Sequence, residues 1–159
     1  MKLFSLLILF SSIFAQSPFD WEENGVPLRQ GTHIEWWKAV EVGNDGEFII
    51  VWSDCRYGIR DIFAQKITTE GELLWGTDGE LVALEDGLKD GITIAQADGR
   101  QEDPIIISDD AGGFFMMWMD YRDEPAKGDI YAQHVLSDGS LQFGIEGTPL
   151  TNLPGKQSA

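Results

Sequence analysis

Apolar residues lie in short runs along the chain, and sequences typical of turns separate these runs. Residues 48–52 and 114–118 are unbroken apolar runs, which predicts strands that are buried on both faces. Residues 62–67 and 130–135 are rich in β-branched and aromatic side chains and are predicted as the strands that follow. No stretch after residue 15 shows a convincing helical period, so an all-β fold is predicted.

Further strands complete each predicted unit. Residues 37–42 and 105–108 are predicted to precede the apolar runs, and residues 73–75 and 141–143 are predicted to begin a last strand. The connections contain Gly, Asn and Asp, which accept the backbone angles of tight turns. These connections are Asn44-Asp45-Gly46, Asp110-Ala111-Gly112-Gly113, Glu70-Gly71 and Ser137-Asp138-Gly139.

The sequence also matches itself. Residues 48–56 match residues 114–122 at an offset of 66, through a shared W-x-D-x-R pattern. Residues 61–65 match residues 129–133 at an offset of 68, through a shared D-I-[FY]-A-Q pattern. The offset of 68 continues through the pairs Gly71 and Gly139, Trp75 and Phe143, Gly79 and Gly147, and Val82 and Leu150. Matching blocks in the same order indicate tandem repeats of about 66 residues.

A third, partial copy precedes these two, because residues 21–28 match residues 143–150. The predicted organisation is a tail strand of a closing blade at residues 16–30, a first repeat at residues 31–96 and a second repeat at residues 97–159. We expect the second repeat to be followed by further copies in a longer protein.

The first residues have the build of a secretory signal peptide, predicted at residues 1–15. Lys2 supplies a positive start, residues 3–14 are apolar apart from serines, and the small residue Ala15 precedes a polar one. The predicted location is therefore secreted, extracellular or at the cell surface. The apolar run is too short to predict a transmembrane segment.

Four short strands per unit in tandem predict four-stranded antiparallel blades, and hence a partial β-propeller. A closed ring needs four or more blades, and the chain holds two. The chain is therefore predicted to belong to a longer protein or to assemble, and a two-layer β-sandwich is the alternative fold.

Charge and cysteine content narrow the chemistry. The formal net charge of −16 repels phosphate backbones and anionic lipid headgroups, so nucleic acid is not a predicted partner. Cys55 is the single cysteine, which excludes an intrachain disulfide and a Cys-based zinc site. The two histidines, His33 and His134, support neither a catalytic triad nor a His-based metal site.

The W-x-D-x-R and D-I-[FY]-A-Q segments, followed by the G-x-x-x-[WF] tail, resemble a repeat of large secreted bacterial proteins. The resemblance covers residues 21–159. It implies propeller-like blades, and it implies surface attachment, since such proteins often end in a cell-surface sorting domain. The sialidase-type Asp-box is not matched by residues 68–75 or 137–143, which weakens a sialidase assignment.

The most prominent polar residues recur in both copies and are predicted to be structural. A catalytic group is needed once, whereas an arginine that bridges carboxylates can stabilise the same hairpin in every unit. These predicted ion-pair residues are Asp54, Arg56 and Asp61, with their counterparts Asp120, Arg122 and Asp129.

Other residues are candidates for binding. The loop after Arg122 is two residues longer than its counterpart, so Asp123, Glu124 and Lys127 form a possible binding loop. Trp36 and Trp37 are adjacent on a predicted strand, so one ring could pack inward while the other is exposed to stack on a sugar. Structural burial of the pair is the favoured alternative.

No cofactor is predicted. Acidic turns offer oxygen ligands for calcium, but the spacing of a calcium-binding loop is absent, and hairpin turns explain the same residues. Calcium therefore stays an alternative at Asp45, Asp109, Asp110 and Asp138.

Two functions from different classes remain. The favoured prediction is a non-enzymatic secreted or cell-surface repeat module that binds an extracellular protein or a glycan. The alternative is a fragment of an extracellular propeller glycoside hydrolase, for which one unit should carry polar residues that break the pattern. The two copies agree at nearly all their polar positions, which favours the module.

Overall fold

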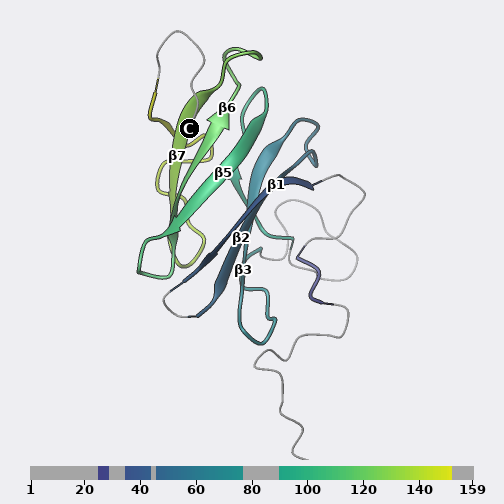
Figure 1. Cartoon of the computed structure of the whole chain (residues 1–159), viewed down its shortest axis with the longest axis vertical. Coiled ribbons are helices and arrows are strands. Elements are labelled where there is room, and N and C mark those ends of the chain that lie inside the picture. The colour runs from purple at the N-terminus through teal and green to yellow at the C-terminus, as the bar shows by residue number, and fades with distance from the viewer. Residues whose placement is uncertain (1–24, 29–34, 44–45, 77–89, 152–159) are drawn as a thin grey trace, which may run out of the picture.

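The computed structural model describes residues 25–28, 35–43, 46–76 and 90–151, and these residues contain strands and no helix (Figure 1). The strands form two four-stranded antiparallel sheets in which neighbours follow the chain order, so the predicted all-β fold is confirmed. Sheet A contains β1 (Glu35–Val42), β2 (Phe48–Asp54), β3 (Asp61–Ile67) and β4 (Ile92–Ala95). Sheet B contains β5 (Gln101–Ser108), β6 (Phe114–Asp120), β7 (Asp129–Val135) and β8 (Thr148–Pro149).

The first three strands of each sheet lie where the sequence predicts them, and the fourth strands do not. Leu73 and Leu141, expected to begin the last strands, form only isolated bridges to β3 and β7. Glutamine side chains explain why pairing stops there. The Gln65 amide accepts from the Trp75 N–H at 2.8 Å and donates to the Trp75 carbonyl at 2.9 Å. The Gln133 amide accepts from the Phe143 N–H at 2.9 Å and donates to the Gly144 carbonyl at 2.6 Å, so the chain leaves each sheet before its last strand.

Residues at matching positions make the same contacts in the two sheets. Trp52 lies opposite Phe63 in sheet A, and Trp118 lies opposite Tyr131 in sheet B. The register also shifts at equivalent places in the two first strands, within β1 and within β5.

A close-packed glycine accompanies each of these tryptophans. Gly91 and Gly147 have positive φ angles of 77° and 68°, and a Cβ at either position would collide with the ring of Trp52 or Trp118. Gly147 therefore corresponds in space to Gly91. Gly79, which the sequence aligns with Gly147, lies outside the described residues.

The two sheets pack face to face, with β5 lying beside β1 (Figure 1). Ile49 and Val51 of β2 are fully buried on one side of this interface, and Phe114 and Met116 of β6 are buried on the other. Trp75 extends from sheet A so that its ring centroid lies 5.9 Å from that of Phe114. These contacts form one apolar core between the sheets.

Polar contacts fix the same interface. Trp75 Nε1 donates to the Ser137 carbonyl at 3.3 Å, which joins the end of sheet A to the turn after β7. Lys66 is buried, donates to the Gly112 carbonyl at 3.0 Å and pairs with Glu47. Each polar group that the interface buries here has a partner, as burial requires.

The second apolar run is buried on one face only. Phe115 and Met117 are 46% and 43% exposed, although their counterparts Ile49 and Val51 are completely buried. The prediction of burial on both faces is therefore wrong for residues 114–118. The reason is the position of the strands, because β2 faces sheet B whereas the corresponding face of β6 points away from sheet A.

The predicted signal peptide at residues 1–15 lies outside the described residues, as does the first part of the predicted tail strand. Of the expected tail strand, only residues 25–28 are described, and they belong to no strand. None of the described residues forms a helix that is long and apolar enough to cross a membrane.

Candidate functional site

A cleft of about 490 Å³ opens where the two sheets meet, at the end that carries the β2–β3 hairpin and the β6–β7 loop. The hairpin contributes Tyr57, Ile59 and Asp61. The linker between the sheets contributes residues 96–98. Sheet B contributes Arg122, Asp123 and Glu146. The cleft therefore combines side chains from both sheets and from the segment that joins them.

The two W-x-D-x-R segments lead into the hairpin and the loop that line this cleft. Asp54 accepts a hydrogen bond from Trp52 Nε1 at 2.9 Å, from the Arg56 backbone N–H at 2.9 Å and from the Arg56 guanidinium at 2.6 Å. Burial alone would raise the pKa of Asp54, but the hydrogen bonds and charge of Arg56 outweigh it and lower the pKa. The guanidinium also lies 3.6 Å from the centre of the Phe63 ring.

Sheet B repeats this network. Asp120 accepts from Trp118 Nε1 at 3.0 Å, from the Arg122 backbone N–H at 3.0 Å and from Arg122 Nη2 at 2.7 Å. The hydrogen bond to Asp120 raises the pKa of Arg122, and the guanidinium lies 4.0 Å from the centre of the Tyr131 ring. Each W-x-D-x-R segment is thus a turn closed by charge-assisted hydrogen bonds between its arginine and its aspartate.

The second carboxylate of each arginine was not found from the sequence. Arg56 Nη1 contacts Asp90, at 3.1 Å to the carbonyl and 3.0 Å to the carboxylate. Arg122 contacts Glu146, at 2.7 Å to the carbonyl and 3.4 Å to the carboxylate. Both partners directly precede a glycine, in Asp90-Gly91 and Glu146-Gly147, but the same acid-glycine pattern recurs elsewhere in the chain and does not single them out.

Asp61 and Asp129 were predicted to form ion pairs with the arginines of the two hairpins. They lie directly opposite Asp54 and Asp120 across the hairpins, but among the described residues no ion pair joins them to Arg56 or Arg122.

Asp61 is instead a buried carboxyl group at the base of the cleft, and it is 3% exposed. Burial raises its pKa to about 7, although a hydrogen bond from the Ala97 backbone N–H opposes the shift, and the charge of Asp54 adds to it. The Gln101 amide, oriented so that its nitrogen donates, reaches Asp61 Oδ1 at 3.1 Å. Asp61 therefore takes up a proton near neutral pH, at the junction of the two sheets.

The cleft as a whole is acidic. Its carboxyl groups belong to Asp61, Asp98, Asp123 and Glu146. Its single cationic side chain, Arg122, is already held by Asp120. The arrangement can accept hydrogen bonds and positive charge from a ligand.

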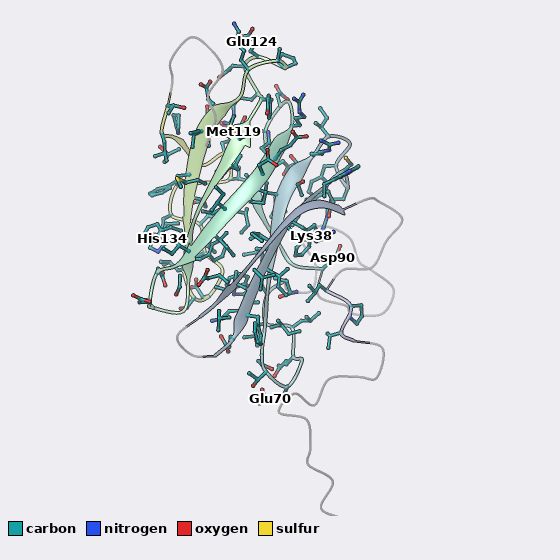
Figure 2. All side chains as sticks on the ribbon, viewed as in Figure 1. Lys38, Glu70, Asp90, Met119, Glu124 and His134 are labelled. Atoms are coloured by element: carbon teal, nitrogen blue, oxygen red, sulfur yellow. The ribbon has the colours of Figure 1, made fainter. Side chains whose placement is uncertain are left out.

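The predicted binding loop lies beside this cleft. Asp123 lines the cleft, whereas Glu124 and Lys127 are exposed and form an ion pair at 3.1 Å. Arg100 Nη1 donates to the Pro125 carbonyl at 3.1 Å, which ties the loop to the linker between the sheets. Glu124 lies at the tip of the loop, at the far end of the molecule from Glu70 (Figure 2).

The tryptophan pair lies on β1, away from the lining of the cleft. The Arg60 guanidinium lies 4.4 Å from the centre of the Trp36 ring, so one face of that ring is covered. Arg60 also pairs with Glu102 of β5, which places Trp36 at the junction of the sheets. The side chain of Trp37 lies outside the described residues.

The acidic turns that suggested calcium are occupied by hydrogen bonds. Asp109 accepts from the N–H groups of Ala111 and Gly113 and contacts His134 at 2.9 Å. These bonds, led by the one with His134, outweigh burial and lower the pKa of Asp109. Asp138 accepts from Ser140, and Asp45 lies outside the described residues. Within the described residues, no three His, Cys, Asp or Glu side chains are grouped as metal ligands.

Two further reactive side chains in the described part of the chain, Cys55 and His134, lie outside the cleft, and His33 is outside the described residues. Cys55 is half-buried in the β2–β3 hairpin. His134 stacks on Phe115, with ring centroids 4.1 Å apart, on the side of sheet B that faces away from sheet A (Figure 2). Comparison of the chain with protein-family models, with curated proteins and with solved structures found no match.

Proposed function

We propose that the chain is a non-enzymatic, exported repeat module of the β-propeller type, and that the acidic cleft binds a basic segment of an extracellular protein. The observation that carries this proposal is the composition of the cleft, in which the carboxylates of Asp98 and Asp123 line a wall whose one arginine is already paired with Asp120 and Glu146. A lysine- or arginine-rich segment supplies the complementary charge and hydrogen-bond donors.

The use of the duplicated polar residues supports a binding role over a catalytic one. Asp54 and Arg56 make the same internal bonds as Asp120 and Arg122, so these residues are committed to the fold in both sheets. The copies differ at Tyr57 and its counterpart Asp123, and both of these residues line the cleft. Variation at a turn that recurs in both copies is expected where a surface is adapted to a partner.

A binding measurement with matched charge changes tests the proposal. The double variant D98N/D123N removes two carboxylates from the cleft, and E70Q/D138N removes two exposed carboxylates elsewhere. Both variants change the net charge equally, so long-range attraction is matched. Titration calorimetry with a lysine-rich peptide in about 0.15 M salt should show affinity reduced about tenfold by D98N/D123N and much less by E70Q/D138N.

Equal losses in both variants would show that attraction is unspecific and would contradict the proposed cleft. Binding of a neutral glycan, lost in D98N/D123N and kept in E70Q/D138N, would replace the basic segment with a sugar as the ligand.

Export is the second part of the proposal, and it rests on the positive start and apolar run of residues 1–15. Expression of the full chain in a bacterial host with a secretion pathway, followed by N-terminal sequencing, should give a mature protein that begins close to Gln16. Retention of Met1 on protein that stays in the cytoplasm would contradict export.

A further inference from the structure

Asp61 is the buried carboxyl group at the base of the cleft, and its hydrogen-bond partners carry no charge. It lies opposite Asp54 in the β2–β3 hairpin, and both side chains are buried. Asp54 binds the guanidinium of Arg56 at 2.6 Å. Asp61 instead accepts from the Ala97 backbone N–H and the Gln101 amide nitrogen. Within the described residues, Asp61 therefore has hydrogen-bond donors but no paired cation.

The surroundings of Asp61 oppose its ionisation. Burial favours the uncharged form of an acid, and the ionised carboxylate of Asp54 adds repulsion across the hairpin. The charge of Arg56 offsets this repulsion only in part, since the guanidinium is bonded to Asp54. Arg60, directly before Asp61 in the chain, is paired with Glu102 of β5. The pKa of Asp61 is accordingly raised to about 7, chiefly by burial.

On the sheet B side, the charges around the cleft are also acidic or already paired. Asp120, at the end of β6, adds to the repulsion on the buried carboxyl group. It holds Arg122, whose guanidinium also contacts Glu146. Asp98 and Asp123 complete the charged lining, and β4, the other neighbour of β3, carries no charged residue. Among the described lining residues, the cleft thus offers the buried carboxyl group no unpaired cation.

We propose that the cleft binds a basic segment most tightly when Asp61 has lost its proton, so that binding and ionisation of Asp61 are coupled. This coupling rests on the proposed function, because it concerns the same cleft and the same class of ligand. A positive charge in the cleft stabilises the ionised carboxyl group, since it supplies the counter-ion that the fold does not provide. By linkage, a bound basic segment lowers the pKa of Asp61, and the affinity rises as the pH increases through about 7.

The size of the coupling follows from distance and dielectric. A lysine or arginine charge about 10 Å from the carboxylate, at an effective dielectric constant of about 20 and partly screened by salt, changes the equilibrium about tenfold. The cleft should therefore bind a basic segment about ten times more tightly with Asp61 ionised than with Asp61 protonated.

Titration calorimetry with an acetylated, amidated lysine-rich peptide tests the coupling, because the charge of lysine is constant below about pH 9. The affinity of the unmodified chain should rise about fivefold between about pH 6 and about pH 8. The affinity of D61N should change by less than about twofold over this range. D61N keeps every other titratable group, so the difference between the two proteins reports the ionisation of Asp61.

Asp129→Asn is the matched control for the calorimetry. Asp129 lies at the equivalent position of sheet B and is outside the lining of the cleft. D129N changes the net charge as D61N does and should retain the rise of affinity with pH. Near-ultraviolet circular dichroism confirms that each variant is folded.

NMR titration of the Asp61 carboxyl carbon gives a second measurement that needs no variant. Its midpoint should lie near pH 7 in the free chain and move to lower pH by about one unit when the peptide is saturating. Calorimetry at about pH 7 in phosphate and in Tris, which differ in ionisation enthalpy, should show that the unmodified chain releases a fraction of one proton on binding and D61N releases less.

Three results would overturn the coupling: a rise with pH of the same size in D61N, an affinity that falls with pH, or an NMR midpoint that the peptide leaves unchanged. Failure of the coupling is distinguishable from failure of the proposed function. Binding that D98N/D123N weakens but that is independent of pH retains the cleft and removes the role of Asp61. Binding that D98N/D123N and E70Q/D138N weaken equally removes both.

Discussion

Sheets A and B have the same internal construction and opposite surroundings. In both, a tryptophan donates to an aspartate two residues later, and an arginine closes the turn. The face of β2 that carries Ile49 and Val51 is nevertheless buried, whereas the corresponding face of β6, with Phe115 and Met117, is exposed. The comparison shows that the motif determines the hairpin, whereas the neighbouring sheet determines which residues are core.

The last strands differ in a second way. β8 follows soon after Phe143, whereas the chain passes through residues 77–89 before it reaches β4. Gly91 and Gly147 nonetheless pack against equivalent tryptophans. The end of each sheet is therefore set by a packing position beside the tryptophan ring and not by distance along the chain.

The largest effect is expected from a cavity in the core between the sheets. Ile49→Ala should lower the free energy of unfolding by about 2–4 kcal/mol, because it removes a fully buried side chain. The matched change Phe115→Ala should cost less than about 1 kcal/mol, since Phe115 is 46% exposed and its removal opens no cavity between the sheets. Urea denaturation at low protein concentration measures both. Equal costs would show that the two faces are not differently covered.

The next largest loss of stability is expected from the arginine that closes the W-x-D-x-R turn in each sheet. Arg56→Ala and Arg122→Ala should each lower the free energy of unfolding by about 1–3 kcal/mol, because both guanidinium groups are mostly buried and hydrogen-bonded to an aspartate. Substitution of either arginine by lysine should recover little of the lost stability, because one ammonium group cannot make the same paired hydrogen bonds. A variant that melts like the unmodified chain would contradict the structural role of that arginine.

The buried carboxyl group of Asp61 should make the stability of the folded chain depend on pH. Its pKa in the folded chain is about 7, above that of an ordinary carboxyl, so the folded state holds a proton that the unfolded state releases. The stability contributed by protonated Asp61 is fully present below pH 4 and is lost as the pH rises through about 7. Asp61→Asn should remove this loss and be more stable than the unmodified chain at pH 8, by on the order of 1–2 kcal/mol.

Thermal melts from pH 4 to pH 8 measure the difference between this variant and the unmodified chain. Asp129→Asn is the matched control, because Asp129 occupies the equivalent position and is less buried. A difference between D61N and the unmodified chain that stays constant with pH would contradict the raised pKa of Asp61.

The smallest effect is expected on the loop that the two copies do not share. Lys127→Ala removes an exposed ion pair with Glu124 and should change the free energy of unfolding by less than about 0.5 kcal/mol. Chemical denaturation measures it, with Arg122→Ala as the comparison. A loss as large as that of Arg122→Ala would show that the loop supports the fold.

Much of the fold could be predicted from the sequence, because the periodicity and turn residues of β2, β3, β6 and β7 are local properties. The fourth strands could not, because Gln65 and Gln133 replace backbone pairing with side-chain bonds, and no periodicity reports this. The partners Asp90 and Glu146 lie at unequal separations from their arginines, so the repeat offset does not align them. The cleft itself arises only when the two sheets meet, which no single segment encodes.

Two adjacent methionines of β6 test the central claim most directly, because one faces sheet A and the other faces away from it. Met116 is 1% exposed and Met117 is 43% exposed. Oxidation of dilute protein by hydrogen peroxide, followed by peptide mass spectrometry, should convert Met117 to the sulfoxide at least about ten times faster than Met116. Equal rates, or faster oxidation of Met116, would contradict a sheet B that is covered by sheet A on one face and open on the other.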